Sequence, residues 1–187
     1  MTITAPPMRL HLPTLPAPVR VRPIEPSDGP ALQAGLACLS PRSRWLRFHQ
    51  PLNRFSAAQL RALVEVDHHD REALLAEIEQ PDTTWQLIAV ARYARVPAPE
   101  AEADQVRAEL ALVVGDPWHR CGVGRMLVDR LAALARERGI AAFEGELLTE
   151  NRPMLQFLRE LGPQIGSSVD FRLFGTTAHA VWHLKET

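Results

Sequence analysis

Apolar and polar positions recur with different periods along the chain, and the period predicts which segments are helices and which are strands. Apolar residues three and four positions apart predict two long amphipathic helices, over residues 122–138 and 151–161. Shorter helices are predicted over residues 31–39, 42–48 and 57–65. Short apolar or alternating runs predict strands over residues 19–23, 85–92, 107–114, 140–148, 169–174 and 178–184, whereas residues 72–78 suit either element. This order predicts an α/β or α+β fold, in which crossover helices connect the strands of one sheet.

Several of the predicted helices carry end signals in the sequence. Ser40 precedes Pro41, the order expected for an N-cap followed by the first helical residue. Ser56 and Gln59 have the spacing of a capping box. Glycines follow the two long helices and are placed to end them: Gly139 and Gly162.

The amino-terminal segment differs from the rest of the chain. Five prolines lie within residues 1–18, and this density opposes helix formation and removes backbone donors. We expect a flexible arm there, either a loose tail or an extended one. The folded domain is expected to cover residues 19–187, a length typical of a single domain. Residues 96–104, rich in proline, alanine and acids, are expected to form a hairpin loop.

The composition narrows the classes of function. The chain has 46% hydrophobic and 23% charged residues, as in soluble globular proteins, and a formal net charge of -1. The lack of a basic excess argues against a nucleic-acid partner. No apolar run reaches the roughly 18 residues that span a bilayer, no secretory signal is evident, and two cysteines are too few for a disulfide framework. We therefore expect a cytoplasmic protein without a membrane partner.

The segment that carries candidate chemistry is the passage from the strand over residues 107–114 into the helix that follows. A polar loop enters that helix through Gly122 and Gly124. The first N–H groups of a helix have no partner within it and lie at the positive end of its dipole. Glycines allow an anion to approach the backbone closely. Arg120 and Arg125 add positive charge at the rim, so the loop is predicted to bind a phosphate group.

Two nucleotide-binding motifs fit this loop poorly. A P-loop requires lysine and then serine or threonine after its last glycine, and Gly124 is followed by Arg125 and Met126. A dinucleotide-binding fold is closer, because Glu144 lies roughly 20 residues after the glycines, where a ribose-binding acid is found. That motif, however, turns directly from strand into helix. Here residues 116–121 intervene, and Leu127 holds the third glycine position.

The sequence from His119 to Gly124 resembles the pyrophosphate loop of the GNAT superfamily of N-acetyltransferases. The resemblance extends to residues 151–155, with Leu161 and Gly162, which are similar to a second cofactor element of that family. Residues 39–48 and 67–76 resemble bacterial protein lysine acetyltransferase domains, which favours a strand for residues 72–78. The resemblance covers residues 19–184. It implies a GNAT-type central mixed, mostly antiparallel sheet flanked by helices.

The resemblance also implies an acetyl-CoA site and the residues that form it. Backbone groups of Leu112, Val113 and Val114 would pair with the pantetheine arm. Asn151 would bind near the pantetheine or near the thiol end, with Met154 one turn further on. Backbone amides would hold the pyrophosphate along one run: His119, Arg120, Cys121, Gly122, Val123, Gly124 and Arg125.

Two positions depart from the pattern of the family. His119 stands where glutamine or arginine is usual, which leaves a backbone cradle possible but changes one side chain. Many members carry a tyrosine seven residues after the asparagine as acid for the leaving thiolate, and Leu158 holds that position here. The lysine acetyltransferase branch often lacks this tyrosine as well.

Acetylation of an amine requires a base for the amine proton and a donor for the thioester oxygen. Glu109 lies where the resemblance places a general base, and half-burial would strengthen it in that role. Glu146 on the next strand is a second candidate, and the N–H of Val114 is a candidate oxyanion donor. The pair His68 and His69 lacks a third ligand at a suitable spacing, so no metal is expected.

These features predict an N-acetyltransferase that uses acetyl-CoA as co-substrate and transfers the acetyl group, or a short acyl group, directly to an amine. The acceptor is either a protein lysine or a small amine. Two alternatives stay open: a non-catalytic acyl-CoA sensor, which the missing tyrosine would suit, and a nicotinamide-dependent enzyme. A homodimer is one of the oligomeric states compatible with the sequence.

Overall fold

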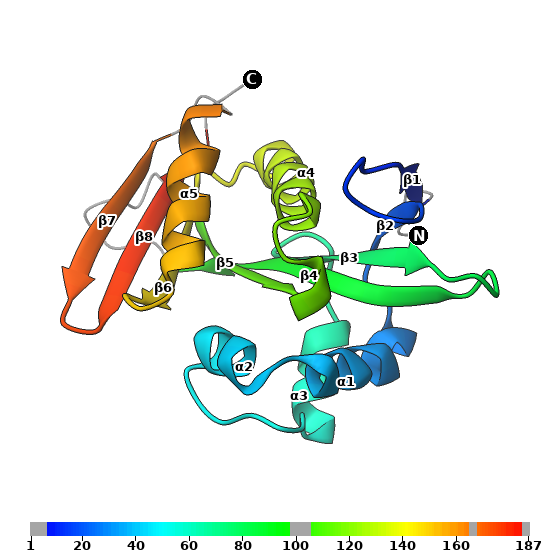
Figure 1. The fold of residues 1–187 in the computed structure, drawn as a ribbon. Coiled ribbons are helices and arrows are strands. Elements are labelled where there is room, and N and C mark those ends of the chain that lie inside the picture. The colour runs from blue at the N-terminus through cyan, green and yellow to red at the C-terminus, as the bar shows by residue number, and fades with distance from the viewer. Residues whose placement is uncertain (1–6, 98–105, 165–167, 185–187) are drawn as a thin grey trace. The chain divides into compact units, whose positions relative to one another are not determined.

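The computed structural model describes residues 7–97, 106–164 and 168–184 of the chain (Figure 1). Eight strands within these ranges form one sheet in the order β1-β2-β3-β4-β5-β6-β8-β7. The strands are β1 (Met8–Leu10), β2 (Val19–Pro23), β3 (Arg71–Glu79), β4 (Trp85–Val96), β5 (Arg107–Val114), β6 (Ala142–Leu148), β7 (Val169–Phe174) and β8 (Thr177–His183). The α-helices are α1 (Gly29–Cys38), α2 (Pro41–Phe48), α3 (Ala57–Val64), α4 (Val123–Glu137) and α5 (Arg152–Gln164).

The described chain divides into two compact units. The first comprises Met1–Arg92 and Leu112–Leu131, and the second Tyr93–Ala111 and Ala132–Thr187. The boundaries fall inside β4, β5 and α4, so these three elements contribute residues to both units.

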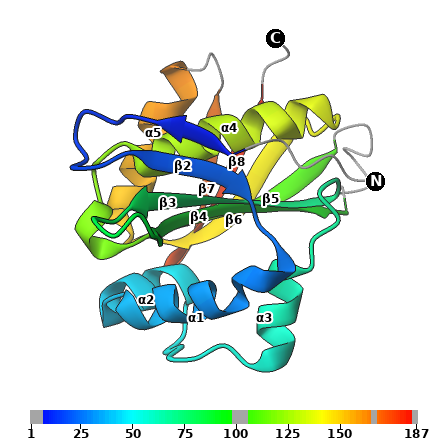
Figure 2. The same ribbon diagram turned by 90° about the vertical axis from the view of Figure 1, so that its right-hand side faces the viewer.

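In the first unit, β2 pairs with both β1 and β3 in antiparallel register, with Met8 opposite Val21 and Val21 opposite Ala76. Helices α1, α2 and α3 lie together on one face of β3 and β4 (Figures 1 and 2). The Ser40 hydroxyl caps α2 by accepting the Ser43 N–H, and α3 begins with the capping box that its sequence predicts. A buried cluster fills the space between helices and strands: Ile24, Leu32, Val64, Ala73 and Leu75.

A buried ionic network joins β2, β3 and the turn before α1. Arg22 contacts Asp28 at 2.7 Å and Glu77 at 2.9 Å, and Arg20 also contacts Glu77, at 2.7 Å. Burial opposes the ionisation of Asp28, but the hydrogen bonds from Arg22 and from the Glu25 N–H outweigh it and lower its pKa. Asp28 and Glu77 are both buried, so loss of the arginine partner would leave an uncompensated buried charge and destabilise the fold.

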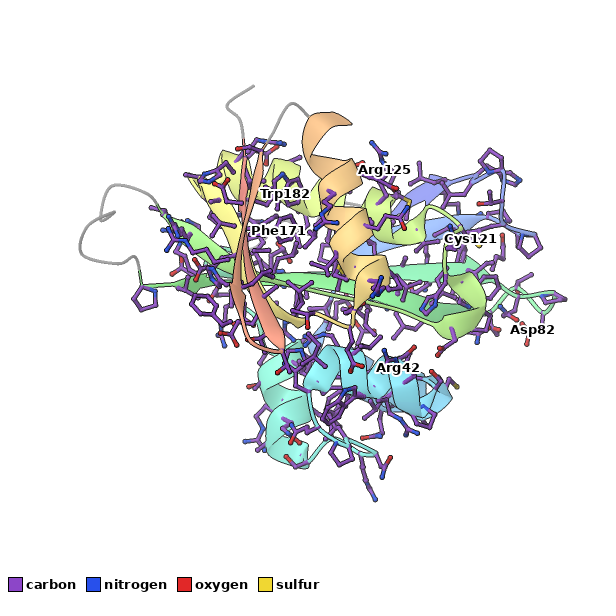
Figure 3. The ribbon with its side chains drawn as sticks, turned by 60° about the vertical axis from the view of Figure 1, so that its left-hand side comes forward. Arg42, Asp82, Cys121, Arg125, Phe171 and Trp182 are labelled. Atoms are coloured by element: carbon purple, nitrogen blue, oxygen red, sulfur yellow. The ribbon has the colours of Figure 1, made fainter. Side chains whose placement is uncertain are left out.

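In the second unit, β8 pairs in antiparallel register with β6 and β7, whereas β5 and β6 are parallel. The sheet is therefore mixed and mostly antiparallel, which confirms the predicted fold class. Helix α5 packs on β6, β7 and β8 over a cluster of Leu147, Leu158, Ala178 and Ala180. Figure 3 labels two aromatic residues of this unit, Phe171 on β7 and Trp182 on β8. The Trp182 ring lies 5.6 Å from that of Phe143.

Most elements lie where the sequence predicts them, and β5 and β7 agree residue for residue. The proline-rich arm contains β1, because Met8–Leu10 is a stretch without proline and can form a short edge strand. Residues 1–6 lie outside the described ranges, as does most of the expected hairpin loop at 96–104. Helix α5 continues past Gly162 to Gln164, so that glycine does not end it.

Candidate functional site

A tight turn and short-range backbone hydrogen bonds shape the loop between β5 and α4. At the end of β5, the Gly115 N–H donates to the Ile88 carbonyl at 2.8 Å. A 3-10 turn over Asp116–Trp118 follows directly. A Cβ at position 115 would lie 3.2 Å from the Trp118 ring and 3.4 Å from the Ile88 oxygen, so the chain turns tightly against its neighbours here. Cys121 and Arg125 mark the start of α4 in Figure 3.

Two residues of the loop have left-handed backbone conformations. Arg120 has φ 62° and Gly122 has φ 81°, with Cys121 between them. Gly122 adopts this conformation readily, whereas a side-chain-bearing residue such as Arg120 rarely does. Turns that bring left-handed residues next to other conformations direct successive N–H groups to one side and form anion-binding concavities.

The hydrogen bonds of this loop are divided unequally between carbonyl and N–H groups. Three carbonyl oxygens accept from side chains. Val114 accepts from His119 Nε2 at 2.9 Å, His119 from Cys121 Sγ at 3.5 Å, and Cys121 from Thr14 Oγ1 at 2.7 Å. Within the described chain, no acceptor is found for five consecutive N–H groups: Arg120, Cys121, Gly122, Val123 and Gly124. The loop therefore presents donors with no protein partner at the positive end of α4.

One of the backbone N–H groups that were predicted to bind the pyrophosphate already donates a hydrogen bond within the protein. The His119 N–H donates to the Asp116 carbonyl at 3.3 Å, so it already has an acceptor in this structure, unlike the five N–H groups that follow it, for which the described residues offer none. Its imidazole instead contacts the Val114 carbonyl. Arg125 lies in the first turn of α4 and contacts Asp129 at 3.5 Å through its guanidinium group.

Gly124 permits the close approach of α4 to the end of β5. A Cβ at this position would lie 3.3 Å from Leu112 Cδ2 and 3.3 Å from Val114 Cγ2, closer than ordinary side-chain contacts. Any larger residue would require these side chains or the start of the helix to shift by a few tenths of an ångström. The glycine therefore fixes the position of the unpartnered N–H groups relative to Leu112 and Val114.

Asp116 connects the same loop to α2. Its carboxylate accepts the Ser40 N–H at 2.9 Å, the Ser40 hydroxyl at 2.8 Å and the Ser43 hydroxyl at 2.7 Å. Burial opposes ionisation of this carboxyl group, but these hydrogen bonds, with a smaller contribution from His119, lower its pKa below the usual value. No local pattern along the chain indicated this anchor, because Ser40 and Ser43 lie 76 and 73 positions before Asp116.

Asn151 and Met154 both have clear structural roles in the second unit. The Asn151 side chain accepts the Met154 N–H at 3.2 Å and so caps α5, and the residue is only 9% exposed. Met154 packs against the cluster beneath that helix. The side-chain oxygen of Asn151 therefore already accepts a hydrogen bond. Its side-chain amide nitrogen, a donor, is the candidate atom for contact with a ligand.

The two predicted base candidates lie on neighbouring strands. Glu109 is opposite Glu144 in the parallel β5–β6 register, and that pairing ends there. Glu146 follows two residues later on the same face of β6, opposite His179 on β8. Both Glu109 and Glu146 are exposed, so the half-burial expected for Glu109 is not present. Of these three glutamates, Glu144 lies near basic side chains: its carboxylate is 3.4 Å from the Arg107 guanidinium and 4.0 Å from the His179 imidazole.

Two surface cavities of the first unit involve other residues. One, of about 550 Å³, is lined by Ile24, Glu25, Pro26, Ser27, Val64, Val66 and His68. The other, of about 510 Å³, is lined by Gln33, Arg54, Phe55, Ser56, Ala57, Gln59 and Leu60. Neither cavity is lined by residues 115–124, the donor loop between β5 and α4.

The segment described above also lies in the part of the chain that matches a known protein family. It consists of a strand, a tight turn, consecutive N–H groups without an acceptor in the described chain, and an amphipathic helix. A model of the acetyltransferase (GNAT) family matches residues 40–162, which include β5, the loop, α4 and most of α5. The chain belongs to the GNAT family.

Individual GNAT proteins resemble this chain to different extents. The acetyltransferase Pat of Mycolicibacterium smegmatis is 28% identical over 142 residues, which cover 76% of this chain and 40% of that protein. An acetyltransferase of Pseudomonas aeruginosa is 25% identical over 144 residues, 77% of this chain and 74% of its own length. This chain therefore spans less than half of Pat and about three quarters of the second relative.

Solved structures agree with the GNAT assignment. The GNAT domain of PAT from S. lividans has a TM-score of 0.80 and 30% identity, and the match covers 95% of this chain and 97% of that domain. An acetyltransferase structure from Salmonella typhimurium, determined with acetyl-CoA, has a TM-score of 0.62. Its identity is 16% over 90% of this chain and 95% of its own, so it shows a similar fold only.

Within this GNAT domain, Leu158 occupies the position where many members have tyrosine. It is 7% exposed and belongs to the apolar cluster beneath α5. Three residues that organise the donor loop were not identified from the sequence: Thr14, Ser43 and Asp116. The contacts Thr14–Cys121 and Ser43–Asp116 join residues 107 and 73 positions apart, and no local spacing signals them. No helix in the described ranges is long and apolar enough to cross a bilayer.

Proposed function

We propose that this GNAT domain transfers an acetyl group, or a related short acyl group, from its coenzyme A thioester to a primary amine. The observation that carries the proposal is the run of five N–H groups from Arg120 to Gly124, which have no acceptor among the described residues. The neighbouring carbonyls of His119 and Cys121 are engaged by side chains. A loop arranged in this way suits a group with many acceptor oxygens and negative charge.

The diphosphate of coenzyme A has these properties. N–H groups at a helix start bind phosphate oxygens directly, and the helix dipole adds favourable electrostatic energy. Arg120 and Arg125 supply positive charge on the same segment. The loop residues proposed to hold the diphosphate are thus Arg120, Cys121, Gly122, Val123, Gly124 and Arg125.

The pantetheine arm is proposed to extend along β5. The β5–β6 pairing ends at Glu109 and Glu144, whereas β5 itself continues to Val114. Backbone groups beyond the last pair can form hydrogen bonds to an amide-containing chain, as a further strand would. Because His119 engages the Val114 carbonyl, we assign this pairing mainly to Leu112 and Val113, and assign the thiol end to the Asn151 amide nitrogen.

The chemistry needs a neutral amine, since a lysine-type ammonium has a pKa near 10.4 and no free electron pair. Glu109, or Glu146, accepts the ammonium proton directly or through a water molecule. The amine nitrogen then bonds to the thioester carbonyl carbon, and the carbon–sulfur bond breaks to release the coenzyme A thiolate. The nitrogen, which is positively charged after the attack, loses its surplus proton to solvent water and so becomes a neutral amide. The Val114 N–H is the proposed donor to the oxygen while it carries negative charge. Leu158 has no proton to give, so the thiolate leaves unprotonated or takes a proton from solvent.

Calorimetry and an activity assay test the proposal together. Acetyl-CoA, coenzyme A and NAD are titrated separately into the full chain, and thiol release is then followed with lysine peptides and small amines. The proposal expects binding of both coenzyme A species and turnover with at least one amine class. Binding without turnover on any amine supports an acyl-CoA sensor. Binding of NAD alone contradicts the coenzyme A assignment.

A further inference from the structure

The amino-terminal arm contacts the donor loop directly through one side chain. The Thr14 hydroxyl donates a hydrogen bond of 2.7 Å to the Cys121 carbonyl oxygen, although the two residues are 107 positions apart. Thr14 lies before residue 40, outside the segment that matches the GNAT family model, whereas Cys121 lies within it.

We infer that Thr14 is a positioning residue that holds the Gly122 N–H in the orientation needed to bind the diphosphate of coenzyme A. The inference rests on the function proposed above. Thr14 donates its hydrogen bond to a carbonyl oxygen of the loop, and we assign it no contact with coenzyme A itself.

The geometry of the peptide bond transmits the effect. The Cys121 carbonyl and the Gly122 N–H belong to one planar peptide unit, and none of the described peptide bonds is cis. In a trans peptide the C=O and N–H bonds point in opposite directions. A donor that fixes the carbonyl on one side therefore fixes the N–H on the other side, where the described part of the chain offers no acceptor.

Without this hydrogen bond the peptide unit would have more freedom. Cys121 lies between Arg120 and Gly122, which both have positive φ, and Gly122 tolerates several other conformations. Rotation of the peptide would exchange the positions of the carbonyl oxygen and the N–H. It would then present an acceptor, and not a donor, to an incoming anion. A peptide unit that is already held in the binding orientation avoids the free-energy cost of reorienting when the anion binds.

The arm is itself held on both sides of Thr14. On one side, β1 pairs with β2, and the Arg130 guanidinium on α4 contacts the Met8 sulfur at 3.7 Å. On the other side, Leu15 is buried at 7% exposure, and its N–H donates to the Leu12 carbonyl at 2.9 Å. The Thr14 hydroxyl is therefore presented by a fixed segment of the first unit.

The test compares Thr14→Val, which removes the donor at nearly constant shape, with Thr14→Ser, which keeps the hydroxyl. The matched control is Thr177→Val, which removes a threonine hydroxyl that donates to the Phe174 carbonyl at 3.1 Å in the β7–β8 turn. Coenzyme A affinity is measured by calorimetry. Affinity for inorganic pyrophosphate is measured from amide shifts of isotope-labelled full chain, and the melting temperature of each variant is recorded.

We expect Thr14→Val to bind coenzyme A and pyrophosphate about three- to tenfold more weakly, the range for one hydrogen bond. Thr14→Ser and Thr177→Val should stay within about twofold of the unchanged chain. In turnover, Thr14→Val should raise KM for acetyl-CoA with little change in kcat.

The outcomes separate this inference from the proposed function. If the unchanged chain binds coenzyme A and Thr14→Val binds it equally well, the role of Thr14 is wrong and the proposed function stands. The role is also wrong if Thr177→Val weakens binding as much as Thr14→Val does. If the unchanged chain does not bind coenzyme A at all, the proposed function itself fails.

Discussion

The Ser43 hydroxyl donates a hydrogen bond of 2.7 Å to Oδ1 of Asp116, so the first turn of α2 is tied to the loop that follows β5. Removal of this donor by Ser43→Ala should lower the free energy of unfolding by about 1 kcal/mol. Asp116→Asn should cost more, about 1–3 kcal/mol, because the amide cannot accept every hydrogen bond that Ser40 and Ser43 donate. Urea unfolding of both variants measures the difference. Equal stability of Asp116→Asn and the unchanged chain would contradict the anchoring role.

The stability contribution of Asp116 should also depend on pH. Its hydrogen bonds lower its pKa in the folded state, so below a pH of about 4 the unfolded chain binds the proton more readily. The contribution is thus fully present above that pH and is lost as the pH falls through the folded-state pKa. The stability gap between the unchanged chain and Asp116→Asn should therefore be larger at pH 7 than at pH 3. A gap that widens in acid would show that the sign is wrong.

Gly124→Ala tests whether the close approach of α4 to β5 serves binding. Alanine favours helix by about 1 kcal/mol over glycine, but its Cβ would lie 3.3 Å from the Leu112 and Val114 side chains. We expect coenzyme A affinity to fall roughly tenfold, because displacement of a binding group by a fraction of an ångström is costly. The control is Gly29→Ala at the start of α1, where a Cβ would meet nothing within 4 Å. That variant should be neutral or up to about 1 kcal/mol more stable. Loss of affinity in both variants would contradict the packing argument.

Asn151 combines a structural role with a proposed binding role, and two substitutions separate them. Asn151→Ala removes the α5 cap and should lower stability by about 1 kcal/mol, measured by thermal or urea unfolding. Asn151→Ser keeps a capping oxygen and removes the amide donor. If the amide binds the pantetheine arm, Asn151→Ser should retain most of the stability and still raise KM for acetyl-CoA about three- to tenfold. An unchanged KM in a stable Asn151→Ser variant would restrict this residue to capping.

Glu109 and Glu146 can be distinguished by neutral substitutions. Glu109→Gln should reduce kcat about 10²- to 10⁴-fold with little effect on coenzyme A affinity, if Glu109 is the general base. Glu146→Gln, made on the same face of the neighbouring strand, is the matched variant. Steady-state kinetics with a saturating amine measure both. A larger loss in Glu146→Gln would transfer the role to that residue, and two unaffected rates would exclude both.

Local signals in the sequence were sufficient for most of the fold. The Ser40–Pro41 pair and the Ser56–Gln59 spacing predicted two helix starts, and both caps are present. The apolar runs predicted β5 and β7 to the residue. These features depend on neighbours a few positions away, which is why they can be read from one sequence. Residues 72–78 are an exception, since alanine and leucine suit a helix as well, and only the family resemblance favoured the strand that is observed.

The site was predicted less completely, because its organisation depends on distant parts of the chain. The glycines and the following helix predicted an anion-binding loop, which stays a prediction; within the described ranges, five consecutive N–H groups of that loop have no protein acceptor. The Thr14 and Asp116 contacts had no local pattern to reveal them. The exposure of Glu109 also could not be predicted, since alternation along β5 sets the face of a side chain and not what covers it.

The ionic network at β2 has a consequence for shortened versions of the protein. A fragment limited to residues 40–162 would lack Arg20 and Arg22 and would leave Glu77 enclosed on β3 without its counter-charges. It would also remove β8, which is hydrogen-bonded along the whole of β6. Such a fragment should aggregate instead of folding, so shortened versions of the protein should retain both β2 and β8.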